Sequence, residues 1–332
     1  MRILQVNSSS TWGGGETHVQ QLTEFLRERG HDVIMAGRPN SRLNPEIKLP
    51  FLNSADFITA KRLRHELQKV GFDILHAHLA RDYTIVAAAA WAMPQSKVVF
   101  TRHLLHPIRP HLFYRRVDAW IAPTARILNT LTPSAQKAAT VIPNWVDLST
   151  FLYRPHALHS PVTIGLLGQL SPHKGHDDAI EAARQLGSSF RMVIAGEGKP
   201  AYKNALKKKA TGLSVEFLGF ASVPRFFRDI DMLMVPSWEE PFGIVLLEAM
   251  AAGIPVIATA SGGPQEIISM PTEGVLVPAR DPSAMANAIK SLASDDERRL
   301  SIIANGRARV EANFDARTVV PRIENVYRRL IG

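Results

Sequence analysis

Cysteine is absent from the 332-residue chain, which rules out both disulfide bonds and thiolate ligands for zinc. Long apolar segments are absent too, because the longest run, from Ile85 to Met93, is too short to cross a bilayer as a helix. The opening residues, Met1 to Asn7, become polar too early for a secretory signal peptide. From these absences we expect a soluble protein of the cytoplasm.

Acidic residues are outnumbered, because 39 Lys and Arg against 30 Asp and Glu give a net charge of +9. A basic surface favours nucleic acids, anionic lipids or phosphorylated ligands as partners. Zinc-finger spacing, basic residues interleaved with aromatics and long basic tracts are all missing, which argues against nucleic acid. The basic side chains are scattered instead, with local clusters at residues 61–64 and 207–209. We therefore expect no nucleic-acid partner.

Apolar residues recur at strand and helix spacing in two successive series along the chain. The first series begins with a strand at residues 2–6 and the second with a strand at residues 162–168. Between them, Phe151 to Pro161 follows neither pattern, so we interpret it as an interdomain linker. Two such series predict two Rossmann-like α/β domains. Helices are expected over residues 17–29, 57–70, 81–93, 177–186 and 315–330, with Asp177 capping the fourth.

The most informative segment runs from Ser237 to Ala258 and reads as loop, helix, turn and strand. Pro241 suits the first turn of a helix, and Gly253 suits the left-handed residue just past its end. Glu240 would precede this helix and Glu248 would lie two turns into it, so the two carboxylates would project toward similar sides.

The amides of Phe242, Gly243 and Ile244 would then form the positive start of that helix. Carboxylates that accept hydroxyls, beside amides that tolerate an anion, suit a sugar attached to a phosphate. A surface helix with two solvated glutamates fits the same spacing when the segment is taken alone. Other parts of the sequence are needed to distinguish a sugar-phosphate site from a solvated surface helix.

A glycine-rich turn, Gly13 to Gly15, connects the first strand to the first helix. Glycines there let the backbone approach a ligand at a helix N-terminus, although a simple flexible turn is the alternative. Their spacing is not G-x-G-x-x-G, so the dinucleotide-binding fingerprint is absent. His78, Arg102 and His103 follow strand ends, where ligands of open α/β sheets bind, and we favour a function only for His103.

The order of these segments resembles the retaining glycosyltransferases of the GT-B fold, family 4 (glycosyl transferases group 1). The most specific piece is the segment from Glu240 to Glu248, which matches the paired-glutamate motif of that family. The resemblance implies two Rossmann-like domains facing each other across a deep cleft. Residues 1–155 would form the acceptor-side domain and residues 156–314 the nucleotide-sugar donor domain, with a C-terminal helix at 315–332 packing back on the first. Weaker pieces in the family's order are Gly13-Gly14, residues 73–78, residues 143–147, Lys174-Gly175 and residues 262–266.

The resemblance also implies roles for individual residues. As catalytic residues, Glu240 would bind hydroxyls of the donor sugar, Lys174 would neutralise the pyrophosphate, and His103 would reach the sugar and the reaction centre. Glu248 would hold the ribose hydroxyls. The substrate-binding residues would be Gly14, Gly15, Gln169, Phe242, Gly243, Ile244 and Glu248. Neither a metal nor a cofactor is expected, and the D-x-D sequence at Asp229 to Asp231 is interpreted as a strand start.

Gln169 departs from the family, which usually has an arginine at this position. An amide lacks the charge and the fork of donors of a guanidinium. Losing one cation beside a leaving diphosphate costs ~2–4 kcal/mol of transition-state stabilisation. Either another cation substitutes, with Arg102 or Arg81 as candidates, or the activity is low.

We expect metal-independent transfer of a hexose-type sugar from a UDP- or GDP-sugar, with retention, to a hydroxyl of a glycan or lipid-linked acceptor. Cell-surface polysaccharide or lipopolysaccharide synthesis would use such a reaction. A catalytically silent nucleotide-sugar-binding protein, a nicotinamide-dependent oxidoreductase and a sugar phosphorylase are the rival interpretations. The basic amphipathic helix at 57–70 suggests a peripheral location on the anionic inner membrane face, although a solvated helix packing on the sheet is the plainer alternative.

Overall fold

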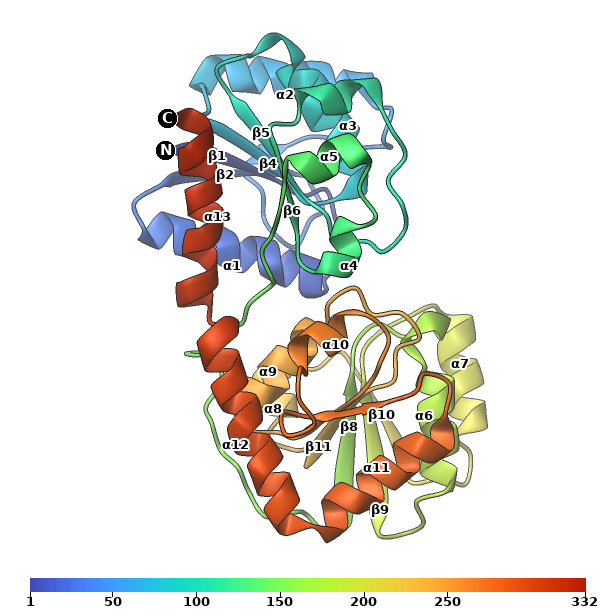
Figure 1. Cartoon of the computed structure of the whole chain (residues 1–332). Helices are drawn as coiled ribbons and strands as arrows, with labels where there is room; N and C mark the ends of the chain where they lie inside the picture. Colours follow the sequence, from blue (N-terminus) through green and yellow to red (C-terminus); the bar gives the residue numbers. More distant parts are fainter. The chain divides into compact units, whose positions relative to one another are not determined.

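The computed structural model describes all residues from 1 to 332, and they form two compact units (Figure 1). The first unit contains Met1–Asn144 and Ala316–Gly332, and the second contains Trp145–Asp315. Each unit is built on its own parallel sheet with helical crossovers, which confirms the predicted fold class. The segment that we interpreted as a linker, residues 151–161, lies within the second unit.

The first unit contains a seven-stranded sheet in the order β3-β2-β1-β4-β5-β6-β7. All six pairings are parallel, as a chain of βα crossovers requires. The strands are β1 (Arg2–Val6), β2 (Asp32–Gly37), β3 (Ile47–Lys48), β4 (Ile74–Ala77), β5 (Lys97–Thr101), β6 (Ala119–Ala122) and β7 (Ala139–Val141). The helices are α1 (Gly14–Glu28), α2 (Phe57–Val70), α3 (Ala80–Ala89), α4 (Ala125–Leu128), α5 (Pro133–Lys137) and α13 (Ala316–Ile331), with 3-10 turns at Ala90–Ala92 and Leu112–Arg116.

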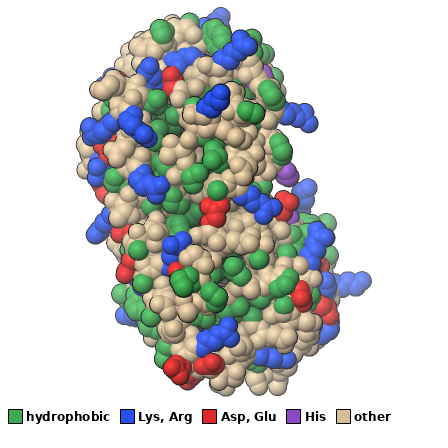
Figure 2. Space-filling model, in the orientation of Figure 1, with side chains coloured by type: hydrophobic (Ala, Val, Ile, Leu, Met, Phe, Trp, Pro, Cys, Tyr) green, Lys and Arg blue, Asp and Glu red, His purple; other side chains and the backbone are tan.

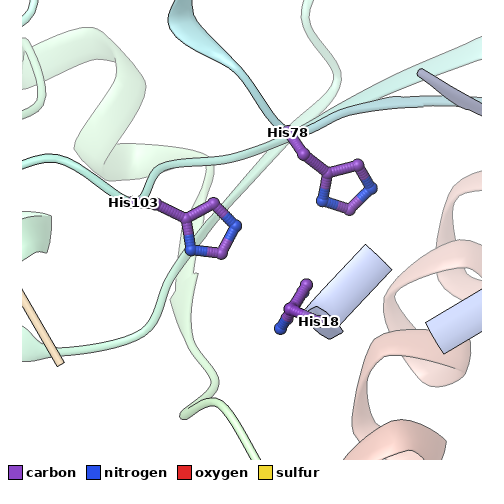
Figure 3. A group of neighbouring side chains, drawn as sticks. All are labelled: His18, His78 and His103. Atoms are coloured by element: carbon purple, nitrogen blue, oxygen red, sulfur yellow. The ribbon is translucent and has the colours of Figure 1, made fainter. Parts of the chain in front are cut away.

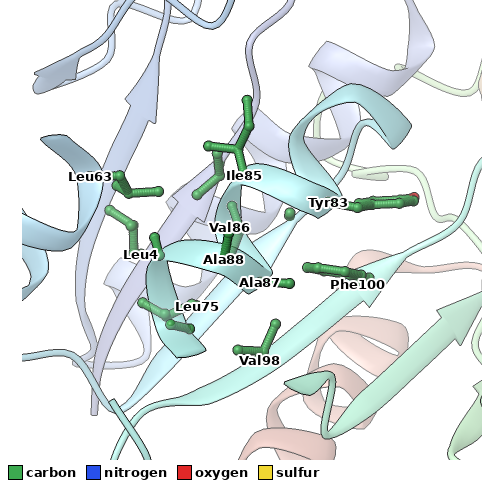
Figure 4. Close-up of a cluster of buried hydrophobic side chains, with 14 of the residues drawn as sticks. Leu4, Leu63, Leu75, Tyr83, Ile85, Val86, Ala87, Ala88, Val98 and Phe100 are labelled. Atoms are coloured by element: carbon green, nitrogen blue, oxygen red, sulfur yellow. The ribbon is translucent and has the colours of Figure 1, made fainter. Parts of the chain in front are cut away.

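Helix α3 contains the first part of the longest apolar run, and every residue from Asp82 to Ala89 is buried. Its side chains pack against Leu63 of α2 and against strand residues such as Leu75 and Phe100 (Figure 4). Helix α2 has the predicted bounds, and it begins where the Asp56 carboxylate accepts the Thr59 amide at 2.9 Å.

The last helix, α13, belongs to the first unit. Its Glu324 carboxylate accepts from Arg29 Nε at 2.5 Å and lies 3.0 Å from His31 Nε2. Its Tyr327 hydroxyl lies 2.6 Å from Nδ1 of the buried His76. The helix is thus joined to β4 and to the segment between α1 and β2 by polar contacts as well as by apolar packing.

The second unit contains a six-stranded parallel sheet in the order β10-β9-β8-β11-β12-β13. The strands are β8 (Val162–Leu167), β9 (Phe190–Ala195), β10 (Val215–Gly219), β11 (Met232–Val235), β12 (Val256–Thr259) and β13 (Val275–Val277). The helices are α6 (His176–Arg184), α7 (Pro200–Lys209), α8 (Val223–Phe226), α9 (Ile244–Ala252), α10 (Gly263–Ile267), α11 (Pro282–Ser294) and α12 (Asp296–Asn313), with a 3-10 turn at Pro172–Lys174.

The cap predicted at Asp177 is wrong. Helix α6 begins at His176, and its N-cap is Gly175, whose φ of 69° is left-handed. A Cβ atom at Gly175 would lie 1.9 Å from the carbonyl oxygen of Pro236, so only glycine fits there. Asp177 instead accepts a hydrogen bond from the Tyr202 hydroxyl at 2.7 Å.

The surface shown in Figure 2 carries Lys and Arg side chains that are spread over the face rather than gathered in one tract. None of the helices is both long enough and apolar enough to cross a membrane.

Candidate functional site

The carboxyl ends of three neighbouring strands in the second unit carry most of the predicted site residues. Strands β8, β11 and β12 are adjacent and parallel, so the loops that follow them meet at one edge of the sheet. The loop after β8 carries Gln169 and Lys174, and the loop after β11 carries Glu240. The sheet therefore brings residues that are about 70 positions apart in the sequence to the same edge.

Lys174 and Glu240 form an ion pair at this edge, with 2.7 Å between Nζ and Oε2. The Ser237 hydroxyl donates to the same carboxylate oxygen at 2.9 Å. The backbone of Glu240 is held as well, because its N–H donates to Ser261 and its carbonyl accepts from the Gly263 amide at 2.8 Å. Glu240 is 8% exposed, so this is a fixed, mostly buried carboxylate with one positive partner.

Helix α9 begins later than the sequence predicted. It starts at Ile244 rather than near Pro241, and its N-cap is Gly243 with a left-handed φ of 102°. Phe242 is buried in the core of the unit, and the backbone of Gly263 packs so closely that a Cβ there would lie 2.2 Å from Phe242. Glu240 therefore precedes the helix, as predicted, and Glu248 lies about one turn into it rather than two.

Glu248 lies half-buried in α9. Burial raises the pKa of its carboxyl group to about 7, because removing a carboxylate from water disfavours the charged form. This side chain therefore changes its charge near neutral pH, whereas an ordinary glutamate is fully ionised there.

A second group at this edge, Trp238 with Arg280, was missed by the sequence analysis. The Trp238 indole donates to an Asp178 carboxylate oxygen at 2.5 Å, and the Arg280 guanidinium lies 4.2 Å from the ring centroid. The Trp238 amide also donates to His173, the neighbour of Lys174, at 2.8 Å. Arg280 follows β13, so the rule that ligands bind at strand ends would have identified it.

Gln169 is exposed at the same edge, and the two cations that we considered as substitutes for an arginine there belong to the first unit. Arg102 is 3% exposed and its guanidinium donates to the His106 carbonyl. Arg81 is exposed. Within the second unit, Arg280 is a cation that reaches the Lys174 loop through Trp238, on which it stacks and whose amide donates to His173.

In the first unit, Gly14 and Gly15 lie in the first turn of α1 rather than in a loop before it. The helix begins at Gly14, three residues before the predicted Thr17, with Gly13 as its N-cap. A Cβ at Gly15 would meet no atom within 4 Å, so packing within this unit does not require a glycine there. The backbone amides of this turn are free of the helical ladder, as at every helix start.

His103 lies in a cluster of histidines with His18 and His78 (Figure 3). Burial, helped by the nearby Arg102 charge, lowers the pKa of His103 to about 4. The pKa values of His18 and His78 are also lowered by burial and by the neighbouring imidazoles. All three rings are thus neutral at physiological pH, and they offer hydrogen bonds or lone pairs rather than charge.

These two Rossmann-like units define a protein of the GT-B fold. The structure of HepE from Anabaena in complex with UDP-glucose matches the chain with a TM-score of 0.86 at 21% identity, covering 99% of this chain and 100% of that one. Among sequence relatives, an uncharacterised glycosyltransferase of Methanocaldococcus jannaschii is 27% identical over 99% of both chains. A phosphatidyl-myo-inositol mannosyltransferase of Mycolicibacterium smegmatis is 27% identical over 96% of this chain and 91% of its own.

The family models "Glycosyltransferase Family 4" and "Glycosyl transferases group 1" match residues 12–150 and 154–309, one in each unit. The chain therefore belongs to the family 4, group 1 glycosyltransferases, and the resemblance drawn from the paired glutamates is confirmed.

Proposed function

We propose that this protein transfers a hexose-type sugar from a UDP- or GDP-sugar to a hydroxyl of a glycan or lipid-linked acceptor, with retention of configuration and without a metal. The observation that carries the proposal is the Lys174–Glu240 pair, which puts a cation and a hydroxyl acceptor 2.7 Å apart at the ligand-binding edge of a Rossmann-like sheet. HepE of Anabaena has been crystallised with UDP-glucose, which supports a nucleotide-sugar donor here.

Donor binding would exchange the partner of Lys174. In the free protein its ammonium neutralises Glu240, and a donor diphosphate carries more negative charge than one carboxylate. When Lys174 turns to the diphosphate, the Glu240 oxygen becomes available to accept sugar hydroxyls. The amides of Phe242, Gly243 and Ile244 would assist at the sugar, and Glu248 would accept the ribose hydroxyls in its ionised form.

Glu240 would act as a binding group rather than as a nucleophile. Glycosyl transfer passes through an oxocarbenium-like state, and its main need is stabilisation of the leaving diphosphate. Lys174 would supply that charge, and a diphosphate oxygen would accept the proton of the acceptor hydroxyl. Arg280, beside the Lys174 loop, is the residue that we propose in place of the arginine that Gln169 replaces.

From the first unit, His103 would bind the sugar as a neutral imidazole, and the α1 amides at Gly14 and Gly15 would hold phosphate oxygens. Because the pKa of His103 is lowered to about 4, it would contribute a hydrogen bond and not a charge above pH 5. We therefore expect no loss of rate near pH 6 that originates from this histidine.

The acceptor side of the proposal rests on the exposed face of α2. Phe57 and Ile58 are 61% and 66% exposed, although large apolar side chains normally avoid water. Phe57 contacts the Phe113 ring at 6.3 Å between centroids, and the exposed Lys61 lines the same apolar hollow. Apolar side chains bordered by cations suit an anionic lipid surface, so we propose a peripheral membrane location and a lipid-linked acceptor.

Purified full-length protein with a panel of radiolabelled UDP- and GDP-sugars tests the activity. Hydrolysis or transfer with at least one donor is expected. Nucleotide binding without any turnover would instead favour a silent binding protein. Co-sedimentation with vesicles of anionic lipid tests the surface: F57S/I58S should reduce binding at low salt, whereas L300S, which removes a half-exposed leucine from α12, should not.

A further inference from the structure

Three imidazoles converge in the first unit from three separate elements (Figure 3). His18 comes from α1, His78 follows β4, and His103 follows β5. One ring nitrogen from each lies within 4.8 Å of the corresponding nitrogens of the other two. The His18 and His103 rings are the closest pair, with 4.9 Å between their centroids.

The hydrogen bonding of His78 prepares it as a ligand. Its Nε2 lies 2.6 Å from the Gln5 side-chain oxygen, an acceptor, so Nε2 carries the hydrogen. Its Nδ1 then bears the lone pair, and that atom is buried with no hydrogen-bond partner. Metal-binding histidines are oriented in this way, with one nitrogen donating to an outer oxygen and the other facing the ion.

His103 adds a second such atom, because its Nε2 is also buried without a hydrogen-bond partner. Buried polar atoms nearly always have a hydrogen-bond partner or a metal ion in native proteins. Two buried nitrogens without a partner in one cluster therefore indicate a ligand-binding site. Burial keeps these rings neutral, and the neutral imidazole is the form that binds metals.

We propose that His18, His78 and His103 bind one divalent transition-metal ion, with Zn²⁺ as the best match, and leave a fourth coordination position open. Three imidazoles with an open position are a known zinc arrangement, at about 2.0–2.1 Å per bond. A tetrahedral ion of that size needs ligand nitrogens ~3.3 Å apart, so small side-chain rotations would draw the cluster together.

The other group of this kind, His156 and His159 with Asp231, does not compete with this cluster. The Asp231 carboxylate already accepts from the Thr163 amide at 2.6 Å and from the His159 amide at 2.9 Å. Its histidines are partly exposed and lie against that carboxylate. This group holds residues 156–159 to the start of β11, and it serves as the matched control.

Binding is tested on the full chain after chelator treatment. We expect one equivalent of Zn²⁺ by calorimetry and, with Co²⁺, the visible absorption of a tetrahedral nitrogen site. H18Q and H103Q should each weaken Zn²⁺ binding about tenfold or more, whereas H159Q should not. Thermal melts identify any variant that fails to fold. His103 is the least buried of the three histidines, so H103Q still tests the site if H18Q unfolds.

Equal Zn²⁺ affinity in the wild type and both triad variants, or loss of binding in H159Q alone, would overturn the proposal. An ion at this site would occupy His103, so Zn²⁺ should inhibit sugar transfer by the wild-type protein. That consequence rests on the proposed function. Binding without inhibition would refute the role of His103 in transfer and leave the metal site standing.

Discussion

The Nζ atom of Lys174 lies 2.7 Å from Oε2 of Glu240, and the Ser237 hydroxyl donates to the same oxygen. The free protein thus keeps its two most strongly implicated groups in contact with each other. Neither is left as a lone charge in a mostly buried position, which would be costly. In the proposed function a donor would have to replace this contact with better ones, and the pair would then favour ligands that carry both hydroxyls and a diphosphate.

K174M and E240Q should each lower turnover by about two orders of magnitude or more, because each removes a contact to the departing donor. The double variant should lose less than the two effects combined, since the groups act as a unit. Initial rates with the preferred donor provide the measurement. E239Q, which neutralises the exposed neighbouring glutamate, is the control and should retain its rate. Wild-type rates in either single variant would refute the assignment.

Q169R should raise turnover by about tenfold or more, because it returns a guanidinium to the edge of the second sheet. R280A should lower it, since Arg280 is the cation that we propose in its place. Single-turnover kinetics separate this effect from product release. The pair should compensate, so Q169R/R280A should be faster than R280A alone. R298A on α12 is the control, and a similar loss there would mean that overall charge, not position, matters.

Glu248 should make donor affinity depend on pH. With a pKa of about 7, its carboxyl group is protonated below that value and then accepts ribose hydroxyls poorly. Donor affinity should therefore increase as the pH rises from 6 to 8, and E248Q should bind weakly with a flat profile. Calorimetry with a nucleotide sugar is suitable because its diphosphate does not titrate in this range. A wild-type profile without a slope would contradict the prediction.

The Glu248 carboxyl group should also make the stability of the protein depend on pH, but stability should fall with rising pH where donor affinity increases. Between pH 4.5 and 7 the folded Glu248 keeps a proton that the unfolded chain has released, so the free energy of unfolding falls as the pH rises. The loss is at most about 3 kcal/mol and is complete above pH 7. E248Q should remove it, and urea unfolding at pH 5 and pH 8 measures the difference. Equal pH dependence in both proteins would refute the raised pKa.

Glu324 should stabilise the first unit. Burial would raise its pKa, but hydrogen bonds from Arg328, Arg29 and His31 outweigh that effect and lower the pKa to about 2. Its contribution is therefore complete above pH 4.5 and is lost as the pH falls toward 2. E324Q should lower the free energy of unfolding by roughly 2–3 kcal/mol at pH 7, as measured by chemical unfolding. E311Q, at an exposed position of α12, should lower it by under about 1 kcal/mol.

Much of the fold follows from local patterns in the sequence. Strand β1 and helix α2 have the predicted bounds because apolar periodicity, Asp56 and Gly71 mark them locally. The start of α9 could not be predicted in the same way. Pro241 favours a helix, but Gly243 turns left-handed so that Phe242 can enter the core beside Gly263, and that constraint comes from a distant loop.

In the site, too, residues marked by nearby sequence could be predicted, whereas residues placed by tertiary contacts could not. Lys174 and Glu240 were named from the family resemblance, whereas the strand-end rule pointed to His103, which follows β5. It did not pair Trp238 with Arg280, because a stacking contact depends on the register of β13 beside β12. It also missed His18, which comes from the body of α1 and carries no turn or charge signal.

Because α13 belongs to the first unit, that unit is assembled from two segments that lie on either side of the second unit in the sequence. Its sheet leaves the ribosome early, but the Glu324 carboxylate and the Tyr327 hydroxyl that contact Arg29, His31 and His76 are synthesised only after the second unit. During translation these three residues lack their α13 partners while the whole second unit is made. A nascent chain stopped at residue 315 would lack α13 and would leave the apolar surface that this helix covers exposed to chaperones and proteases.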